Sequence, residues 1–207
     1  MAVEKFTVMT SVAAPLLRQN IDTDVIIRVE RLVALPPDQL GPYAFESLRF
    51  RADGTEDPDF VLNKPDYREA GIILAGDNFG CGSSREHAVW ALWGRGVRAV
   101  IAPSFGDIFF SNCFQNGMLP IALPIETIRE IADEVEASPG NARVTIDLPK
   151  SEIISPTGRR IPFSMDPTRQ TQLLAGLDEI GITLLREPEI AAFQARDRNN
   201  RPWIYQP

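Results

Sequence analysis

The chain has 207 residues, of which 44% are hydrophobic and 24% charged, as in an ordinary globular protein. A net charge of −7 argues against nucleic acid or an anionic membrane as a partner, and no apolar run reaches membrane-spanning length. Two cysteines are too few for a disulfide framework, a zinc site or an iron–sulfur cluster held by this chain alone. We therefore expect a cytoplasmic protein that binds no metal by itself and folds as one domain over residues 1–207.

The N-terminal third begins with a predicted strand over residues 6–17, followed by the polar turn NIDTD at 20–24 and a short buried strand at 25–27. In this turn Asp22 and Asp24 flank Thr23. These side chains either help to form a functional site or only cap their own turn. The residues of this turn alone do not distinguish the two interpretations. Residues 28–67 contain many turn signals, with short helices predicted at 28–33 and at 42–50, the second with Phe45 and Leu48 inward. Such a long irregular stretch indicates a binding loop or lid.

The central stretch, GDNFGCGSSREH at 76–87, lies between a predicted buried strand at 71–75 and an apolar helix-forming run at 88–93. Gly80 and Gly82 allow positive φ and a close approach of a ligand to the main chain. Ser83 and Glu86 have capping-box spacing, which predicts that the helix begins there. A helix N-terminus favours an anion, and Arg85 adds a bidentate cation. The stretch therefore predicts a carboxylate or phosphate site with a serine hydroxyl beside it.

Other interpretations of this stretch are weaker. It is not a P-loop, because no lysine precedes Ser83, and not a dinucleotide fingerprint, because Arg85 stands where the third glycine belongs. A thiol hydrolase built on Cys81 and His87 lacks a third, orienting group. Taken singly, Ser83 is more often a plain helix cap, and His87, the only histidine, more often a packing residue.

The remainder alternates between predicted strands and helices. Strands are predicted at 97–102, 119–123, 144–148, 152–155 and 159–163. Helices are predicted at 104–115, 126–137, 167–175 and 189–196, with a short element at 181–185 and a polar tail at 197–207. In the first of these helices, Ser104 and Asp107 form the capping pair, and Ile108 and Phe109 are assigned to the core. The fold class is therefore α/β.

Three motifs together resemble a known family. The stretch at 76–88, NIDTDVII at 20–27 and IAPSFGDIF at 101–109 resemble the aconitase superfamily's swivel domain, a mobile β/β/α domain. The chain length and the segment at 176–184 are similar to the family of small subunits of bacterial 3-isopropylmalate dehydratases. The resemblance implies a hydro-lyase that interconverts 2- and 3-isopropylmalate by dehydration and rehydration in leucine biosynthesis. It also implies a dicarboxylate substrate, no cofactor on this chain, and a separate large subunit that carries a [4Fe–4S] cluster.

The resemblance also implies roles for individual residues. Ser83 would be the general base, acting as an alkoxide, Ser84 a substrate contact and Arg85 the carboxylate clamp. Asp24 and Arg28 would border the substrate. Supporting positions that hold the motif in place would be Gly80, Gly82, Glu86, His87, Asp22 and Thr23. A free serine hydroxyl is far too weak an acid for this task at neutral pH, so the donors and the helix-end field at 80–85 would have to stabilise its oxyanion.

One departure from the family pattern concerns the substrate. After Ile27 the family usually continues with proline and a basic, aromatic stretch, whereas this chain has RVERLV at 28–33. The chemistry is unaffected, but a related dehydratase for citraconate, dimethylmalate or homoaconitate stays open. A non-catalytic, anion-binding regulatory module is a third possibility, and the joint presence of Ser83, Ser84 and Arg85 argues against it.

Overall fold

A mixed seven-stranded sheet forms the centre of the computed structural model, which describes residues 4–82, 86–140 and 143–205. The strand order is β4-β3-β2-β1-β5-β6-β7. The strands are β1 (Val8–Leu16), β2 (Ile72–Ala75), β3 (Ala99–Ala102), β4 (Leu119–Ala122), β5 (Arg143–Asp147), β6 (Glu152–Ile154) and β7 (Arg160–Pro162). Strands β1 to β4 pair in parallel, and β5 to β7 extend the sheet antiparallel from the other side of β1. The predicted α/β class is confirmed.

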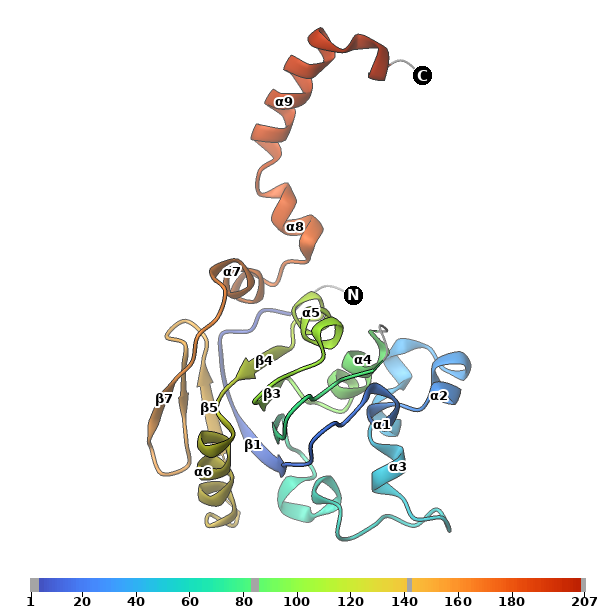
Figure 1. Cartoon of the computed structure of the whole chain (residues 1–207), viewed down its shortest axis with the longest axis vertical. Helices are drawn as coiled ribbons and strands as arrows, with labels where there is room; N and C mark the ends of the chain where they lie inside the picture. Colours follow the sequence, from blue (N-terminus) through green and yellow to red (C-terminus); the bar gives the residue numbers. More distant parts are fainter. Residues whose placement is uncertain (1–3, 83–85, 141–142, 206–207) are drawn as a thin grey trace.

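Helices cover both faces of the parallel half (Figure 1). Helix α6 (Ile125–Glu136) packs on β1, β2 and β3, whereas α4 (His87–Gly94) lies on the opposite side with α1 (Thr23–Ile26) and α5 (Asp107–Gln115). The all-buried strand β2 shows how the sequence produces this layering. Ile72 and Leu74 join the core under α6, and Ile73 and Ala75 join the core under α4, because successive side chains of a strand point to opposite faces. A strand covered on both faces is encoded by a continuous apolar run.

Residues 28–67 form short helical turns: α2 (Val29–Ala34), η1 (Pro37–Gln39), η2 (Gly41–Tyr43), α3 (Glu46–Arg49), η3 (Val61–Asn63) and η4 (Pro65–Tyr67). The helix predicted at 28–33 is confirmed. The one predicted at 42–50 is divided at Phe45, whose left-handed backbone (φ 57°) separates η2 from α3 while its ring is fully buried. Arg49 braces the region from within. Its guanidinium donates to the carbonyl of Pro42 at 2.9 Å and to Asn63 Oδ1 at 3.2 Å.

Three local predictions are wrong. Residues 25 and 26 end α1 and Ile27 is its C-cap, so no strand forms there, since the Asp22 side chain caps that helix. Ser104 does not cap α5, which has Gly106 as its N-cap, because the Ser104 hydroxyl accepts a hydrogen bond from the Asn78 amide at 2.8 Å. Ile108 is 46% exposed, since α5 turns Phe109 toward the core instead.

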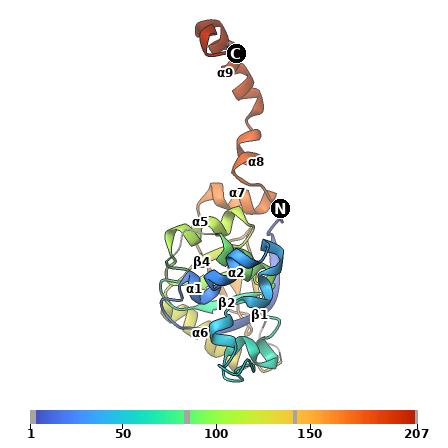
Figure 2. The ribbon, with the colours of Figure 1, turned by 90° about the vertical axis from the view of Figure 1, so that its right-hand side faces the viewer.

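The C-terminal part leaves the body of the molecule (Figures 1 and 2). Helix α7 (Pro167–Ala175), with the bounds predicted, contacts α5. It is followed by α8 (Glu179–Leu184), α9 (Glu187–Asn200) and η5 (Pro202–Tyr205). The predicted helix at 189–196 is therefore longer at both ends, and most of the tail expected at 197–207 has helical structure in its described part, 197–205. Among the described residues, no helix is long and apolar enough to cross a membrane.

Candidate functional site

The candidate site lies where the parallel strands β1, β2 and β3 end. The segments that follow these strands, at 20–23, 77–82 and 104–106, run side by side and are called the seam below. Isolated bridges join Asp22 to Cys81 and Phe79 to Phe105. Because the carboxyl ends of parallel strands meet at one edge of a sheet, three motifs that are far apart in the sequence become neighbours here.

Main-chain hydrogen bonds fasten the first two segments together. They run from Asn20 N–H to Asp77 O (2.8 Å), from Gly80 N–H to Ile21 O (2.7 Å) and from Thr23 N–H to Cys81 O (2.8 Å). The side chains of Asn20 and Asn78, both in the left-handed region with φ of 53° and 58°, are also bonded to each other at 2.9 Å. The upstream turn is therefore part of the site's framework, and is more than a solvated, self-capped turn.

The third segment closes the seam from the other side. Phe79 N–H donates to Ser104 O at 3.1 Å, and Gly106 N–H donates to Phe79 O at 2.9 Å. The Phe79 ring is fully buried and meets the Phe109 ring edge-on, with the ring centroids 5.5 Å apart. The central motif is thus held between two flanking segments by backbone bonds and one buried aromatic pair.

The glycines of the motif serve packing as well as ligand access. Gly80 has φ 72°, and a Cβ atom there would lie 2.3 Å from Phe109 Cγ. The space at Gly80 is therefore filled by the Phe109 ring, which differs from the expectation of an open approach for a ligand. Gly82 has φ 101°, and a Cβ atom there would lie 3.4 Å from the hydroxyl oxygen of Thr23, an ordinary contact. Its positive φ alone explains the glycine.

The two acids of the upstream turn have different tasks. Asp22 Oδ1 accepts from Val25 N–H at 2.7 Å, so this carboxylate caps α1. Thr23 is buried against the motif. Asp24, in the first turn of α1, is exposed and leaves its carboxylate turned away from the core. Of the two acids singled out, Asp22 thus has a structural task and Asp24 is the one available to a ligand.

Helix α4 begins later than predicted. Its first residue is His87 and its N-cap is Glu86, whose carbonyl accepts from Val89 N–H at 2.9 Å. The expected start of the helix at Ser83 is therefore wrong, and the Ser83 side of the expected capping box lies outside the described residues. The His87 ring lies 4.7 Å from the Trp90 ring, between centroids. Ser83, Ser84 and Arg85 lie outside the described residues, between Gly82 of the seam and Glu86 of the cap.

An open cleft of about 700 Å³ adjoins the start of α4, and no sequence pattern indicated it. It is lined by Pro37, Asp38, Glu86, Trp90, Gln115, Asn116, Asp178, Glu179 and Ile180. These residues come from four regions of the chain, so no local pattern could have predicted them. Four of them are carboxylates, which disfavour a dianionic ligand. The cleft therefore borders the candidate anion site and does not replace it.

The charged residues at the start of α2 form ion pairs within the protein. Arg28 pairs with Glu30 at 3.2 Å. Arg31 Nε donates to Glu46 Oε2 at 2.9 Å, and its guanidinium lies 4.2 Å from the centroid of the Tyr43 ring. The hydrogen bond from Arg31 lowers the pKa of Glu46 below its ordinary value. Arg31 therefore faces α3 and the body rather than a ligand, while Arg28 stays exposed.

The two cysteines differ in environment. Cys113 is completely buried, and this burial raises the pKa of its thiol well above the usual value. Cys81 is half-buried in the seam, and both are free thiols. Within the part of the chain that the structure describes, no group of three histidine, cysteine or acidic residues is placed to hold a metal ion. The residues present do not fit an iron–sulfur cluster.

Comparison with known proteins gives consistent matches over most of the chain. Residues 3–126 match the family model of the aconitase C-terminal domain, 129–167 the LeuD_N model, and 179–205 the model of the C-terminal domain of the 3-isopropylmalate dehydratase small subunit. Proteins named 3-isopropylmalate dehydratase small subunit are 53% identical in Paramagnetospirillum magneticum and 52% in Gluconacetobacter diazotrophicus. Each alignment covers 97% of this chain, with 100% and 96% of the relative. A crystal structure of 3-isopropylmalate dehydratase from Methanocaldococcus jannaschii matches with a TM-score of 0.64 and 28% identity, over 91% of this chain and 99% of that one.

Proposed function

Because the chain belongs to the family of 3-isopropylmalate dehydratase small subunits, we infer that it is the small subunit of a hydro-lyase that interconverts 2- and 3-isopropylmalate in leucine biosynthesis. The observation that carries this proposal is the seam, which unites the three motif segments beside the start of α4. The substrate is a small dicarboxylate, and the enzyme is complete only with its large subunit. With two free thiols, we place it in the cytoplasm.

The reaction sets three chemical requirements. A base removes the proton from the carbon next to a carboxylate, the neighbouring carbon loses hydroxide, and cations hold the carboxylates as charge builds on them. We assign the first task to Ser83, with Ser84 as a second hydroxyl contact, and the third task to Arg85. In the reverse, hydrating direction the same Ser83 returns the proton to carbon. In the sequence, all three residues stand between Gly82 of the seam and Glu86, the N-cap of α4.

We assign the Lewis acid that the reaction needs to the large subunit, where a [4Fe–4S] cluster would supply it. This chain offers two cysteines, one fully buried, where a cluster of this kind takes three or four thiolates. What the chain contributes is therefore proton transfer and substrate binding. No step of its own requires a metal ligand.

The side group of the substrate is assigned to the exposed face of α2. Arg28 and Arg31 are engaged with Glu30 and Glu46. Val29 and Val33, one helical turn apart, remain as the exposed apolar pair. An isopropyl group calls for such neighbours, because each buried methylene favours binding by about 0.8 kcal/mol. This wall favours isopropylmalate over the smaller citraconate, and Asp24 and Arg28 are the polar groups that border it.

Replacement of the proposed base tests the function. Ser83→Ala, assembled anaerobically with the large subunit, should lower kcat by roughly 10²–10⁴-fold with little change in KM, because the hydroxyl acts mainly in the transition state. Ser47→Ala, an exposed serine on α3, is the matched control and should keep wild-type kinetics. Activity should be assayed on isopropylmalate, citraconate and dimethylmalate. Near-normal turnover of Ser83→Ala in a folded complex would reduce Ser83 to a structural residue, and a wild-type preference for citraconate would reassign the substrate.

A further inference from the structure

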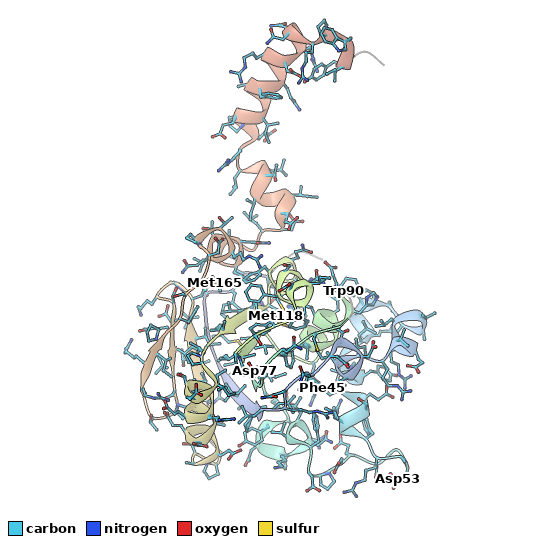
Figure 3. All side chains as sticks on the ribbon, viewed as in Figure 1. Phe45, Asp53, Asp77, Trp90, Met118 and Met165 are labelled. Carbon is cyan, nitrogen blue, oxygen red and sulfur yellow. The ribbon has the colours of Figure 1, made fainter. Side chains whose placement is uncertain are left out.

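The C-terminal arm, residues 178–205, projects away from the body of the protein (Figures 1 and 2). Its root is tied to the body by the hydrogen bond from Gln115 Nε2 to Glu179 Oε1 at 3.2 Å. Beyond that root, within the described part of the chain, α9 makes its main packing contacts with η5, which belongs to the arm itself. Figure 3 shows side chains along α8, α9 and η5 standing out into open space.

Large apolar side chains gather on this arm without cover. Of the ten large hydrophobic residues exposed in the described chain, six lie here, each more than half exposed. They are Ile180, Leu184, Leu185, Phe193, Trp203 and Ile204. Apolar residues collected on one element of a monomer mark an interaction surface, whereas singly scattered ones do not. These exposed side chains therefore indicate that the arm packs against another protein surface.

The arm nevertheless has a defined local structure. Asp178 caps α8 by accepting from Gly181 N–H at 2.7 Å. At the far end, the buried Asp197 accepts from Arg201 Nε at 2.6 Å and from the Tyr205 hydroxyl at 2.9 Å. Isolated helices of this length are only marginally stable in water. The arm therefore has a capped first helix and a hydrogen-bonded far end, although α9 packs little on the body.

The position of residues 178–180, where the arm leaves the body, indicates which partner the arm binds. Asp178, Glu179 and Ile180 line the same cleft as Glu86 and Trp90, and Trp90 lies near the end of the body from which the arm leaves (Figure 3). Glu86 directly follows the proposed catalytic residues 83–85, so a protein that completes the active site must come against this side of the body. Helix α9 by itself is ~21 Å long, at 1.5 Å per residue over its 14 residues, so the arm extends well beyond this side of the body. A second copy of this chain has no comparable reason to lie at the site.

We propose that the C-terminal arm is the docking element by which this chain holds the large subunit, a proposal that rests on the function proposed above. Its apolar side chains pack on an apolar strip of the large subunit beside the active site. The carboxylates of the adjoining cleft, Asp38, Glu86, Asp178 and Glu179, face basic side chains of the same partner. The family match confined to 179–205 shows that this segment recurs in small subunits as a unit.

The test is the affinity of the full-length chain for the large subunit of the same organism, purified anaerobically. The triple variant Phe193→Ser, Trp203→Ser, Ile204→Ser should raise Kd at least about 100-fold, since aromatic anchors dominate interface energies. With saturating large subunit, its kcat should return to near wild type, because no residue of the arm is assigned to catalysis. The matched control is Val8→Ser, an equally exposed apolar residue on β1 far from the arm along the chain, which should leave Kd unchanged.

Several results would overturn the proposal. One is a triple variant that binds as tightly as the control. Another is sedimentation showing that the wild-type chain dimerises through the arm and that the triple variant is monomeric with an unchanged Kd. If circular dichroism shows that the triple variant misfolds, a chain ending at residue 177 replaces it, with the same expected loss. If the wild-type chain binds the large subunit tightly, the triple variant loses that affinity, and the complex does not turn over isopropylmalate, the proposed function is refuted and the docking role stands. If the complex turns over isopropylmalate and the triple variant binds with an unaltered Kd, the docking role is refuted and the proposed function stands.

Discussion

Gly80→Ala tests whether Phe109 fixes the shape of the seam. A Cβ atom at position 80 would lie 2.3 Å from Phe109 Cγ and 2.5 Å from Cδ1, so the ring must move or the backbone must shift. Overpacking of this kind costs about 1–3 kcal/mol. A left-handed alanine adds roughly 1–2 kcal/mol, partly offset by about 0.4–1 kcal/mol from the less flexible unfolded chain. We expect a net loss of about 2–4 kcal/mol.

Gly96→Ala is the matched control. Gly96 also has positive φ, 94°, but nothing lies within 4 Å of the added Cβ. It therefore carries the backbone penalty without the clash, and its loss should stay near 1 kcal/mol. Urea unfolding of the isolated chain measures both. With an m-value of about 2 kcal/mol per M, Gly80→Ala should unfold roughly 1–2 M earlier than the wild type.

A double-mutant cycle isolates the contact itself. Phe109→Ala should cost about 3–5 kcal/mol alone, because it removes a fully packed ring. Adding Gly80→Ala to that variant should then cost no more than Gly96→Ala does, since the ring that clashes is gone. Equal losses for Gly80→Ala and Gly96→Ala in the wild-type background would refute the argument that Phe109 is the reason for the glycine.

Asp22→Ala should destabilise the chain by about 1 kcal/mol in urea unfolding, because it removes the cap of α1, and Asp22→Asn should recover most of that loss; equal losses for both would show that the cap contributes nothing. In thiol titration, Cys81 should react in the native chain and Cys113 only after unfolding, since burial raises the pKa of the Cys113 thiol; two reactive thiols in the native state would contradict this. The hydrogen bond from Arg31 lowers the pKa of Glu46 below its ordinary 4.5, so the stabilisation it contributes is complete above pH 4.5 and is lost as the pH falls through the lowered value. The Tm difference between the wild type and Glu46→Gln should accordingly shrink below pH 4.5, and a difference independent of pH would contradict the pairing.

The sequence by itself was enough for the class of fold and for most elements. Apolar runs of four residues located β2 and β3, because a strand covered on both faces needs an unbroken hydrophobic stretch. Helix α7 was predicted with the bounds observed, since its signals are local: Pro167 at the first turn after the capping Asp166, and Gly176 at the left-handed end. The motifs at 20–27, 76–88 and 101–109 likewise indicated one site, through their resemblance to a family.

Tertiary structure decided what depends on partners remote in the sequence. Residues 25–27 were predicted as a strand, but the chain forms α1 there, where the main chain of Thr23 is bonded to Cys81, 58 residues away. Ser104 had the pattern of a helix cap, but its hydroxyl serves Asn78, 26 residues away in the chain. The acidic cleft draws its lining from four regions, and the arm's exposure follows from the direction in which the chain leaves α7. Local periodicity and capping residues determine whether a segment forms a helix or a strand. Hydrogen-bond partners and apolar surfaces that are distant in the sequence determine where the element ends and what it packs against.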